Sequence, residues 1–339
     1  MAGADSIIGG GTDLSAIVDE HSVSLIDQFL LDTVGGTAHT TDLDGAILVT
    51  GTGSNGEVQG VLLPNGVAVL GTINSGTLHL DVSLPDGLGL VFAAHDGISV
   101  EEVSTFLFSI VDQYLPPGTN DALRANLLEA VDDLVSSIEA LGLPSITVTM
   151  VDFINSTPST QLSGEKFGAL PSNEVTFDPG NSGSTDLFAF NLRSLSPSEL
   201  LLIKNVENAL VSGDGVVKIG DNNGTLITSD SANQQIIGGG GNDTLIGGGG
   251  HDTLTGGAGD DVFAFSRVGD YTITDFTPGH DTFAFKLPGV TNVQELLHMV
   301  TSSEQTTAGV TFHLANDTSI TLVGVTASEL TADMIKFTF

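Results

Sequence analysis

Short runs that alternate between apolar and polar residues fill much of the chain between residues 46 and 94, and this period predicts β-strands. Turn signals separate the runs at Ser54-Asn55-Gly56, Pro64-Asn65-Gly66 and Pro85-Asp86-Gly87. Strands joined by such short turns predict an antiparallel meander. The predicted strands are AILVTG, EVQGVLL, GVAVLGTI, TLHLDVSL and GLGLVFAA, and later SITVTMVDF, NEVTFD and DLFAFNL.

Two segments between these strands have the helical period instead. Ser99 and Glu102 form a capping box ahead of an apolar stripe, and Pro116 stops it. A second apolar stripe follows directly. We therefore expect helices near residues 100–115 and 120–141 that pack against the sheet.

From about residue 220 the apolar period changes to nine residues. Three consecutive units, residues 238–246, 247–255 and 256–264, fit the pattern Gly-Gly-x-Gly-x-Asp-x-U-x, where U is a large apolar residue. The residues at nine-residue spacing are Ile227, Ile236, Leu245, Leu254 and Phe263. A flexible glycine-rich linker would not keep its aspartates and apolar residues in strict phase.

This unit resembles the RTX, or hemolysin-type, calcium-binding nonapeptide repeat, over about residues 220–285. The resemblance implies a parallel β-roll in which each unit forms a turn and a very short strand, with U pointing inward. Two units complete one coil, so loops two units apart stack at roughly the 4.8 Å strand spacing.

Aspartates stacked in this way require a cation. Asp243 would lie over Asp261, and two like charges at that spacing repel by roughly 4 kcal/mol at an effective dielectric near 20. Carboxylates together with carbonyl oxygens that glycines allow to turn inward form an oxygen-only shell, which favours several Ca²⁺ ions over Mg²⁺ or Zn²⁺. The expected ligand residues are Asp243, Asp252, Asp261, Gly239, Gly241, Gly248, Gly250, Gly257 and Gly259.

The ends of the repeat are less regular. Asp270 continues the nine-residue phase and Asp281 repeats it after a slip, so both are candidates for outer sites. Residues 220–228 and 229–237 keep the apolar position but lack aspartate at position six. They are predicted to be degenerate cap turns without full sites. His251 occupies a variable loop position and is expected to face solvent.

The composition restricts the possible partners. The chain has 42 acidic residues against 8 basic ones, a net charge of −34, so it should repel nucleic acid and attract cations. A hydrophobic content of 40% nevertheless indicates a folded protein. The lack of cysteine excludes disulfides, thiolate metal sites and thiol nucleophiles.

The export route follows from the resemblance. No Lys or Arg precedes Arg124, so an N-terminal signal peptide is not expected, and no apolar run is long enough for a transmembrane segment. RTX proteins typically use type I secretion machinery with an uncleaved C-terminal signal, and fold outside the bacterium. The terminal MIKFTF is equally compatible with such a signal and with an ordinary closing strand.

No catalytic residues are predicted. The sequence has no H-E-x-x-H, G-x-S-x-G or Walker motif, and His95-Asp96 has no evident nucleophile. We therefore favour a calcium-binding structural protein at the cell surface or in the matrix, an S-layer or filament subunit whose partner is itself. The alternatives are a secreted enzyme with an unrecognised site and a calcium-dependent adhesin.

The expected fold is mainly β. An N-terminal antiparallel β-rich domain with two helices, residues 41–212, precedes the parallel β-roll of residues 213–285 and a C-terminal cap and secretion signal at residues 286–339. Residues 1–40 are a possible assembly arm, because DSIIGGGTD near the N-terminus echoes QQIIGGGGND in the repeat.

Overall fold

The computed structural model describes residues 39–43, 46–52, 58–64, 69–75, 78–84, 88–99, 101–103, 105–107, 145–155, 174–180, 186–193 and 199–338, together with single positions at 125, 128, 130, 131, 134, 135 and 195. Nearly all of the proposed assembly arm, residues 1–38, lies outside these ranges, so that hypothesis stays a prediction.

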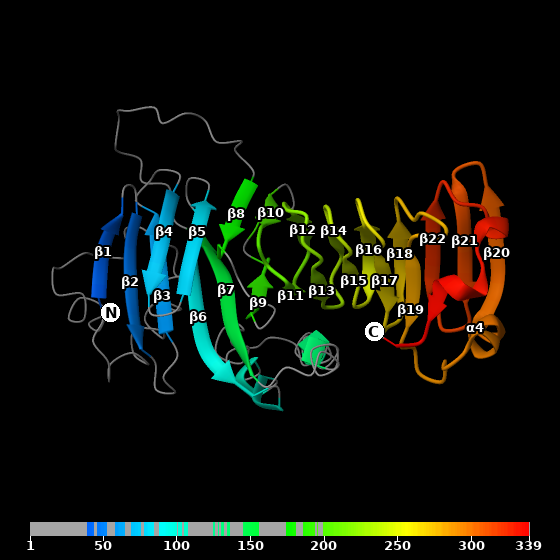
Figure 1. Ribbon diagram of the computed structural model, residues 1–339, viewed down its shortest axis with the longest axis horizontal. Coiled ribbons are helices and arrows are strands. Elements are labelled where there is room, and N and C mark those ends of the chain that lie inside the picture. The colour runs from blue at the N-terminus through cyan, green and yellow to red at the C-terminus, as the bar shows by residue number, and fades with distance from the viewer. Residues whose placement is uncertain are drawn as a thin grey trace.

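Two facing β-sheets run along the length of the molecule (Figure 1). The first sheet has the strand order β1-β2-β3-β6-β7-β9-β11-β13-β15-β17-β19-β23 and the second has the order β20-β21-β22-β18-β16-β14-β12-β10-β8-β5-β4. The strands of the first sheet are β1 (His39–Leu43), β2 (Ala46–Thr52), β3 (Val58–Pro64), β6 (Leu88–Ile98), β7 (Ile146–Asn155), β9 (Asp186–Asn191), β11 (Asn208–Ser212), β13 (Leu226–Ser229), β15 (Thr244–Ile246), β17 (Val262–Phe265), β19 (Thr282–Phe285) and β23 (Ile335–Lys336). Those of the second are β4 (Val69–Ser75), β5 (Leu78–Leu84), β8 (Glu174–Asp178), β10 (Leu200–Ile203), β12 (Gly215–Ile219), β14 (Gln234–Ile237), β16 (Gly250–Thr255), β18 (Gly269–Ile273), β20 (Val300–Thr306), β21 (Gly309–Leu314) and β22 (Ser319–Val323).

The N-terminal strands pair antiparallel, as predicted, but they do not form a single meander. The hairpin of β4 and β5 joins the second sheet, and β3 pairs directly with β6 in the first. This division lets apolar side chains of β5 and β6 face one another in the core, among them Val82, Leu84, Leu90 and Phe92. A meander in one layer would leave that apolar face uncovered.

Parallel pairing begins earlier in the chain than the nine-residue repeat. β7 pairs parallel with β9, and β8 pairs parallel with β10, although the sequence predicts the roll from residue 213. These first coils are longer than two nine-residue units and lack the glycine-rich turns, so no period marks them. The division of the chain into four domains stays a prediction, but both sheets continue across residue 213.

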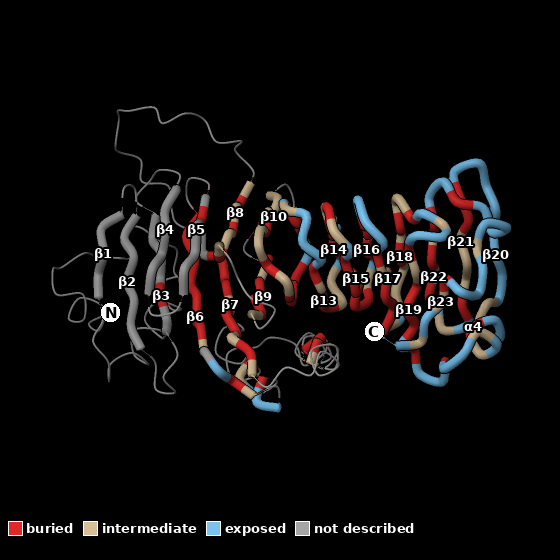
Figure 2. Tube along the Cα trace, viewed as in Figure 1, coloured by how far each residue is buried: buried red, intermediate tan, exposed pale blue. Residues whose placement is uncertain are grey.

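The core of the roll is the predicted ladder of apolar residues between the two sheets. Its members alternate between the sheets, so that Ile227 pairs in register with Leu245, and Leu245 with Phe263. Figure 2 shows this buried stripe along the roll. The five residues predicted from the period, Ile227, Ile236, Leu245, Leu254 and Phe263, are all fully buried. The nine-residue period therefore predicted the side-chain direction correctly.

The two predicted helices are confirmed where the structure describes them. The backbone N–H of Ser99 donates to Oε2 of Glu102, which is one half of a capping box, and Oγ of Ser99 donates to the same oxygen. Helical residues are described at 101–103 and 105–107 and at single positions between 125 and 135. Their buried side chains pack on the first sheet in one cluster, which includes Val103, Leu107, Ala130, Val131, Leu134, Val148, Leu187 and Leu210. Within the described residues, no helix has the length and apolar content needed to cross a membrane.

The last fifty residues cap the C-terminal end of the roll. Helix α4 (Val293–Met299) leads into the antiparallel strands β20, β21 and β22, and β22 extends the second sheet parallel to β18. Two short 3-10 helices, η4 (Ala327–Glu329) and η5 (Ala332–Met334), precede β23, which pairs parallel with β19. Part of MIKFTF thus forms a closing strand, while its role as a secretion signal stays a prediction. An apolar cavity of about 320 Å³ lies between α4 and the ends of both sheets.

Candidate calcium sites

The aspartates at position six form a ladder along one side of the roll. The backbone N–H of Thr225 donates to Oδ1 of Asp243 (2.8 Å), and that of Asp243 donates to Oδ1 of Asp261 (2.9 Å). The N–H of Asp261 donates in the same way to Oδ1 of Asp281 (2.9 Å). Asp243 therefore lies next to Asp261, as the spacing predicted, and Asp281 continues the ladder despite the slip in sequence.

Asp252 occupies the same position on the other side of the roll, where the backbone N–H of Gln234 donates to its Oδ1 (2.9 Å). Asp270 does not continue this second row. An extra residue in the preceding loop places Tyr271 opposite Asp252, and Asp270 opposite His251. The carboxylate of Asp270 is half exposed and contacts Nδ1 of His251 at 3.0 Å. This corrects the expectation that Asp270 completes an outer site, while His251 faces solvent as predicted.

One carboxylate oxygen of each central aspartate has no donor. Asp243 and Asp252 are 1% and 2% exposed, and the Oδ2 atom of each accepts no hydrogen bond from any described residue. A buried acceptor without a donor is costly, and a bound cation would satisfy it. The oxygen-only chemistry of these atoms fits Ca²⁺.

Burial also shifts the titration of these groups. It raises the pKa of Asp243 to about 7 and that of Asp252 to about 8, with smaller contributions from the neighbouring carboxylates of Asp261 and Asp230. The pKa values of Asp261 and Asp281 are raised for the same reason. A Ca²⁺ ion would remove this penalty, because it favours the charged form of each carboxylate.

The glycines of the repeat turns bring backbone carbonyl oxygens to the same region. A Cβ atom on Gly248 would collide with the carbonyl oxygen of Ser229, and one on Gly259 would collide with that of Gly241. All six predicted glycines have positive φ: Gly239, Gly241, Gly248, Gly250, Gly257 and Gly259. Only glycine fits these positions, so the turns can supply carbonyl oxygens beside the aspartates.

Within the described ranges, no group of three or more His, Asp or Glu side chains lies close enough together to hold a metal ion. The candidate sites therefore combine single carboxylates from stacked turns with backbone carbonyl oxygens. A bound calcium ion would neutralise these carboxylates and would be held by oxygen atoms of the stacked turns.

A pair of glycine substitutions tests this packing. Gly248→Ala should destabilise the calcium-bound protein by on the order of 4 kcal/mol, because it adds a collision with Ser229 O to the strain of a positive φ. Gly279→Ala has the same strain, with φ at +86°, but meets nothing within 4 Å, so it should cost only about 1 kcal/mol. Urea denaturation in calcium measures both, and equal losses would contradict this account.

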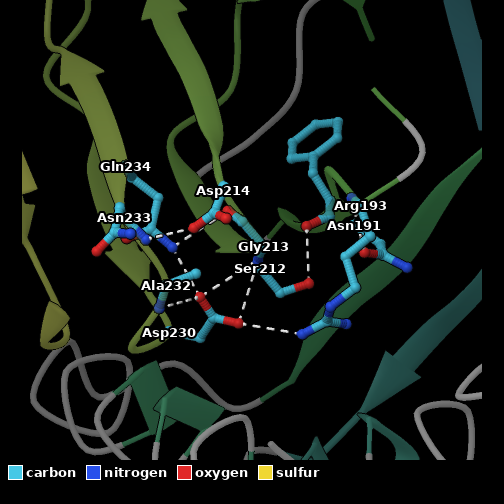
Figure 3. Close-up of polar contacts among 10 residues, drawn as sticks. Asn191, Arg193, Ser212, Gly213, Asp214, Asp230, Ala232, Asn233 and Gln234 are labelled. Atoms are coloured by element: carbon cyan, nitrogen blue, oxygen red, sulfur yellow. Dashed lines mark hydrogen bonds and ion pairs between the residues drawn. The ribbon is translucent and has the colours of Figure 1, made fainter. Parts of the chain in front are cut away.

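Sequence reasoning missed a second set of aspartates, whose carboxylates accept hydrogen bonds from protein donors in turns on either side of the regular units. Asp230 is fully buried, and its Oδ1 accepts from Ala232 N (3.1 Å) and Gln234 Nε2 (2.7 Å). Its Oδ2 accepts from Gly213 N (3.1 Å) and forms an ion pair with Nη2 of Arg193 (3.3 Å). Figure 3 shows the Asp230 carboxylate surrounded by these donors. An arginine thus supplies the positive charge at this turn.

A signal for this set exists in the sequence. Asp221 and Asp230 both stand at position two of their nine-residue units, where the regular repeat has glycine. Asp221 accepts from the backbone N–H groups of Asn205 (2.5 Å) and Asn223 (2.7 Å). Asp275, beyond the regular units, accepts similarly from Gly256 N and Gly257 N. Aspartates that lie outside position six therefore mark turns whose carboxylates accept hydrogen bonds from groups of the protein itself.

The comparisons with known proteins agree with this geometry. No curated protein matches the chain by sequence. Residues 228–263 match the family model of the RTX calcium-binding nonapeptide repeat in four copies, a span that takes in residues 229–237 as well as the regular units. This segment of the roll is therefore an RTX calcium-binding repeat region.

Proposed function

We propose that the protein is an extracellular calcium-binding structural protein that assembles head to tail at the cell surface or in the matrix, as an S-layer or filament subunit. The observation that supports this most is the way both sheets end. Among the described strands, β1 and β4 end the two sheets on one side of the molecule, and β23 and β20 end them on the other (Figure 1). The two opposite ends thus present strand edges.

Two strands, β23 and β20, end the sheets at the C-terminal cap, and β20 is the longer and more exposed of them. Six consecutive residues of β20, 301–306, are exposed, and β21 pairs with only one side of the strand. An edge strand offers unpaired N–H and C=O groups to a second chain. Contact between unlike ends is heterologous, so it continues from subunit to subunit and gives a filament or lattice.

Calcium would control this assembly in two ways. A net charge of −34 opposes association of identical subunits, and bound cations reduce that charge. The repeat segment also lies between the two sheet ends, so its folding sets their relative position. Export through type I secretion machinery, proposed from the RTX repeat, would bring the chain into calcium outside the cell. We further propose that the protein is not an enzyme.

Sedimentation of the purified protein tests the proposal. Polymer should pellet in millimolar calcium and dissolve to monomer in EGTA. An edge-blocking pair, Ser303→Pro and Glu304→Pro, refines the test, since neighbouring residues of an edge strand direct their N–H groups to opposite sides. The variant that keeps the parent's melting temperature should lose assembly. A folded monomer in calcium would instead favour a secreted enzyme or an adhesin.

A further inference from the structure

The structure assigns Gln234 a role as a calcium ligand: we propose that its side-chain Oε1 and Oδ2 of Asp252 hold one Ca²⁺ ion between the turn of residues 229–237 and the turn of residues 247–255. This inference rests on calcium binding by the repeat and is independent of self-assembly. A protein that binds calcium but stays monomeric would leave it intact.

Hydrogen bonds fix the orientation of the Gln234 amide. Its Nε2 donates to Oδ1 of Asp230 (2.7 Å) and to the carbonyl oxygen of Gly213 (3.2 Å) (Figure 3). Both N–H groups of the amide therefore have acceptors, and rotating the amide by half a turn would place Oε1 against those same acceptors. The Oε1 atom must point away from them.

Oε1 then has no donor of its own. Gln234 is 2% exposed, and its Oε1 accepts no hydrogen bond from any residue that the structure describes. Position six of this turn thus carries a buried, oriented oxygen where the regular units carry aspartate. The sequence predicted a cap turn without a full site, because glutamine does not match the motif.

Asp252 provides the second oxygen. Gln235 pairs in register with Thr253, which places Gln234 beside Asp252 on neighbouring strands. The backbone N–H of Gln234 donates to Oδ1 of Asp252, while Oδ2 accepts no hydrogen bond from the described residues. Two buried acceptors at stacked positions cannot satisfy one another, whereas a cation satisfies both. Ca²⁺ accepts amide as well as carboxylate oxygens.

The charge around this site differs from that of the regular sites. The charge of Asp230 raises the pKa of Asp252, and Arg193 forms an ion pair with Asp230. The ion would therefore meet one uncompensated carboxylate, whereas two face one another between Asp243 and Asp261. Since ligand charge sets calcium affinity, we expect this site to bind about ten-fold more weakly than the regular sites.

The chain contains a reporter beside the site. A Cβ atom at Gly247 would lie 2.7 Å from Cε1 of Tyr271 and 2.9 Å from Oδ2 of Asp252, so the ring and the carboxylate flank the same glycine. Tb³⁺ replaces Ca²⁺ at oxygen sites and emits when a nearby tyrosine is excited. The experiment uses the full-length protein with Tyr114→Phe, which leaves Tyr271 as its one tyrosine.

Calcium calorimetry and Tb³⁺ emission should then separate two variants. Gln234→Met removes Oε1, so the protein should bind one calcium ion fewer and lose the Tb³⁺ emission excited through Tyr271. Gln234→Glu keeps an oxygen at the position of Oε1 but sets its second oxygen against Oδ1 of Asp230 and the carbonyl oxygen of Gly213, so the protein should lose stability in EGTA while it keeps the same number of calcium ions and the Tb³⁺ emission. The exposed neighbour supplies the matched controls, Gln235→Met and Gln235→Glu, and neither should change either signal.

A purely structural role for Gln234 gives a different result. Gln234→Met would then lower stability while the number of bound ions stayed the same, and this outcome would overturn the proposal. If Gln234→Met fails to fold, Gln234→Glu still decides the question, because the loss of one bound calcium ion in a variant that keeps an oxygen at this position would also overturn it.

Discussion

In the absence of calcium, the repeat segment is expected to become less stable as the pH rises from about 4.5 to about 8. Burial raises the pKa of Asp243 to about 7 and that of Asp252 to about 8, from 3.8. The folded state therefore binds more protons than the unfolded state over this range, and its stability is lost as the pH passes through the folded-state values. At about 1.4 kcal/mol per pH unit, ionising Asp243 alone costs on the order of 4 kcal/mol, a large part of a domain's stability.

Calcium should reverse this dependence. The ion binds the deprotonated carboxylates, so its affinity increases with pH and the bound protein should be most stable near neutral pH. Hydrogen exchange of residues 238–285, measured in EGTA and in calcium across the pH range, tests both expectations: stability that decreases with pH in EGTA and increases with pH in calcium. Magnesium at the same ionic strength is the control, since its rigid octahedral shell suits these turns poorly. Stability in EGTA that increased between pH about 4.5 and about 8 would contradict the expectation.

The second large effect is expected for Asp261→Asn, with opposite signs in the two conditions. Asp261 accepts from the backbone of Asp243 and donates its own N–H to Asp281, so it stands in the middle of the ladder. An amide keeps the acceptor for Asp243 but removes the charge. In calcium, ion binding on both sides is weakened, and the loss should be on the order of 4 kcal/mol or more.

In EGTA the same substitution should stabilise the protein, because it removes one member of a row of repelling, buried carboxylates whose pKa values are raised. Asp260→Asn is the matched control. Asp260 is the preceding residue and is exposed, so this variant measures the effect of losing one negative charge outside the ladder. Thermal unfolding by circular dichroism in each condition measures the change. Destabilisation by Asp261→Asn in EGTA as well as in calcium would contradict this expectation, because the negative charge would then stabilise the fold without the ion.

Those features of the fold that repeat with a short period could be predicted from the sequence. The phase of Leu245, Leu254 and Phe263 predicted their burial, and the phase of Asp243 and Asp261 predicted that they stack. A period is visible in the sequence because each unit forms the same local structure, a tight turn followed by a strand with one inward-pointing side chain. The helices were predictable for a similar reason, since their caps and stripes are local.

Features that depend on contacts between distant segments could not be predicted in this way. The β4–β5 hairpin changes sheets to cover an apolar face, and its own sequence does not show which face it will meet. Arg193 reaches Asp230 from a turn that precedes the repeat, and neither residue belongs to a motif. Asp270 follows the nine-residue spacing in the sequence, but it does not lie opposite Asp252 in the structure. One extra residue in a loop shifts the strand register, so Tyr271 takes that place.

The turn closed by Arg193 and Asp230 has a consequence for the order in which the chain folds. In an array whose units contact only their neighbours, the slow step is forming the first unit, and later units add to an existing surface. A turn that carries its own positive charge can form before any metal arrives. We therefore expect the coil ahead of residue 238 to fold first and calcium to govern the addition of the later turns.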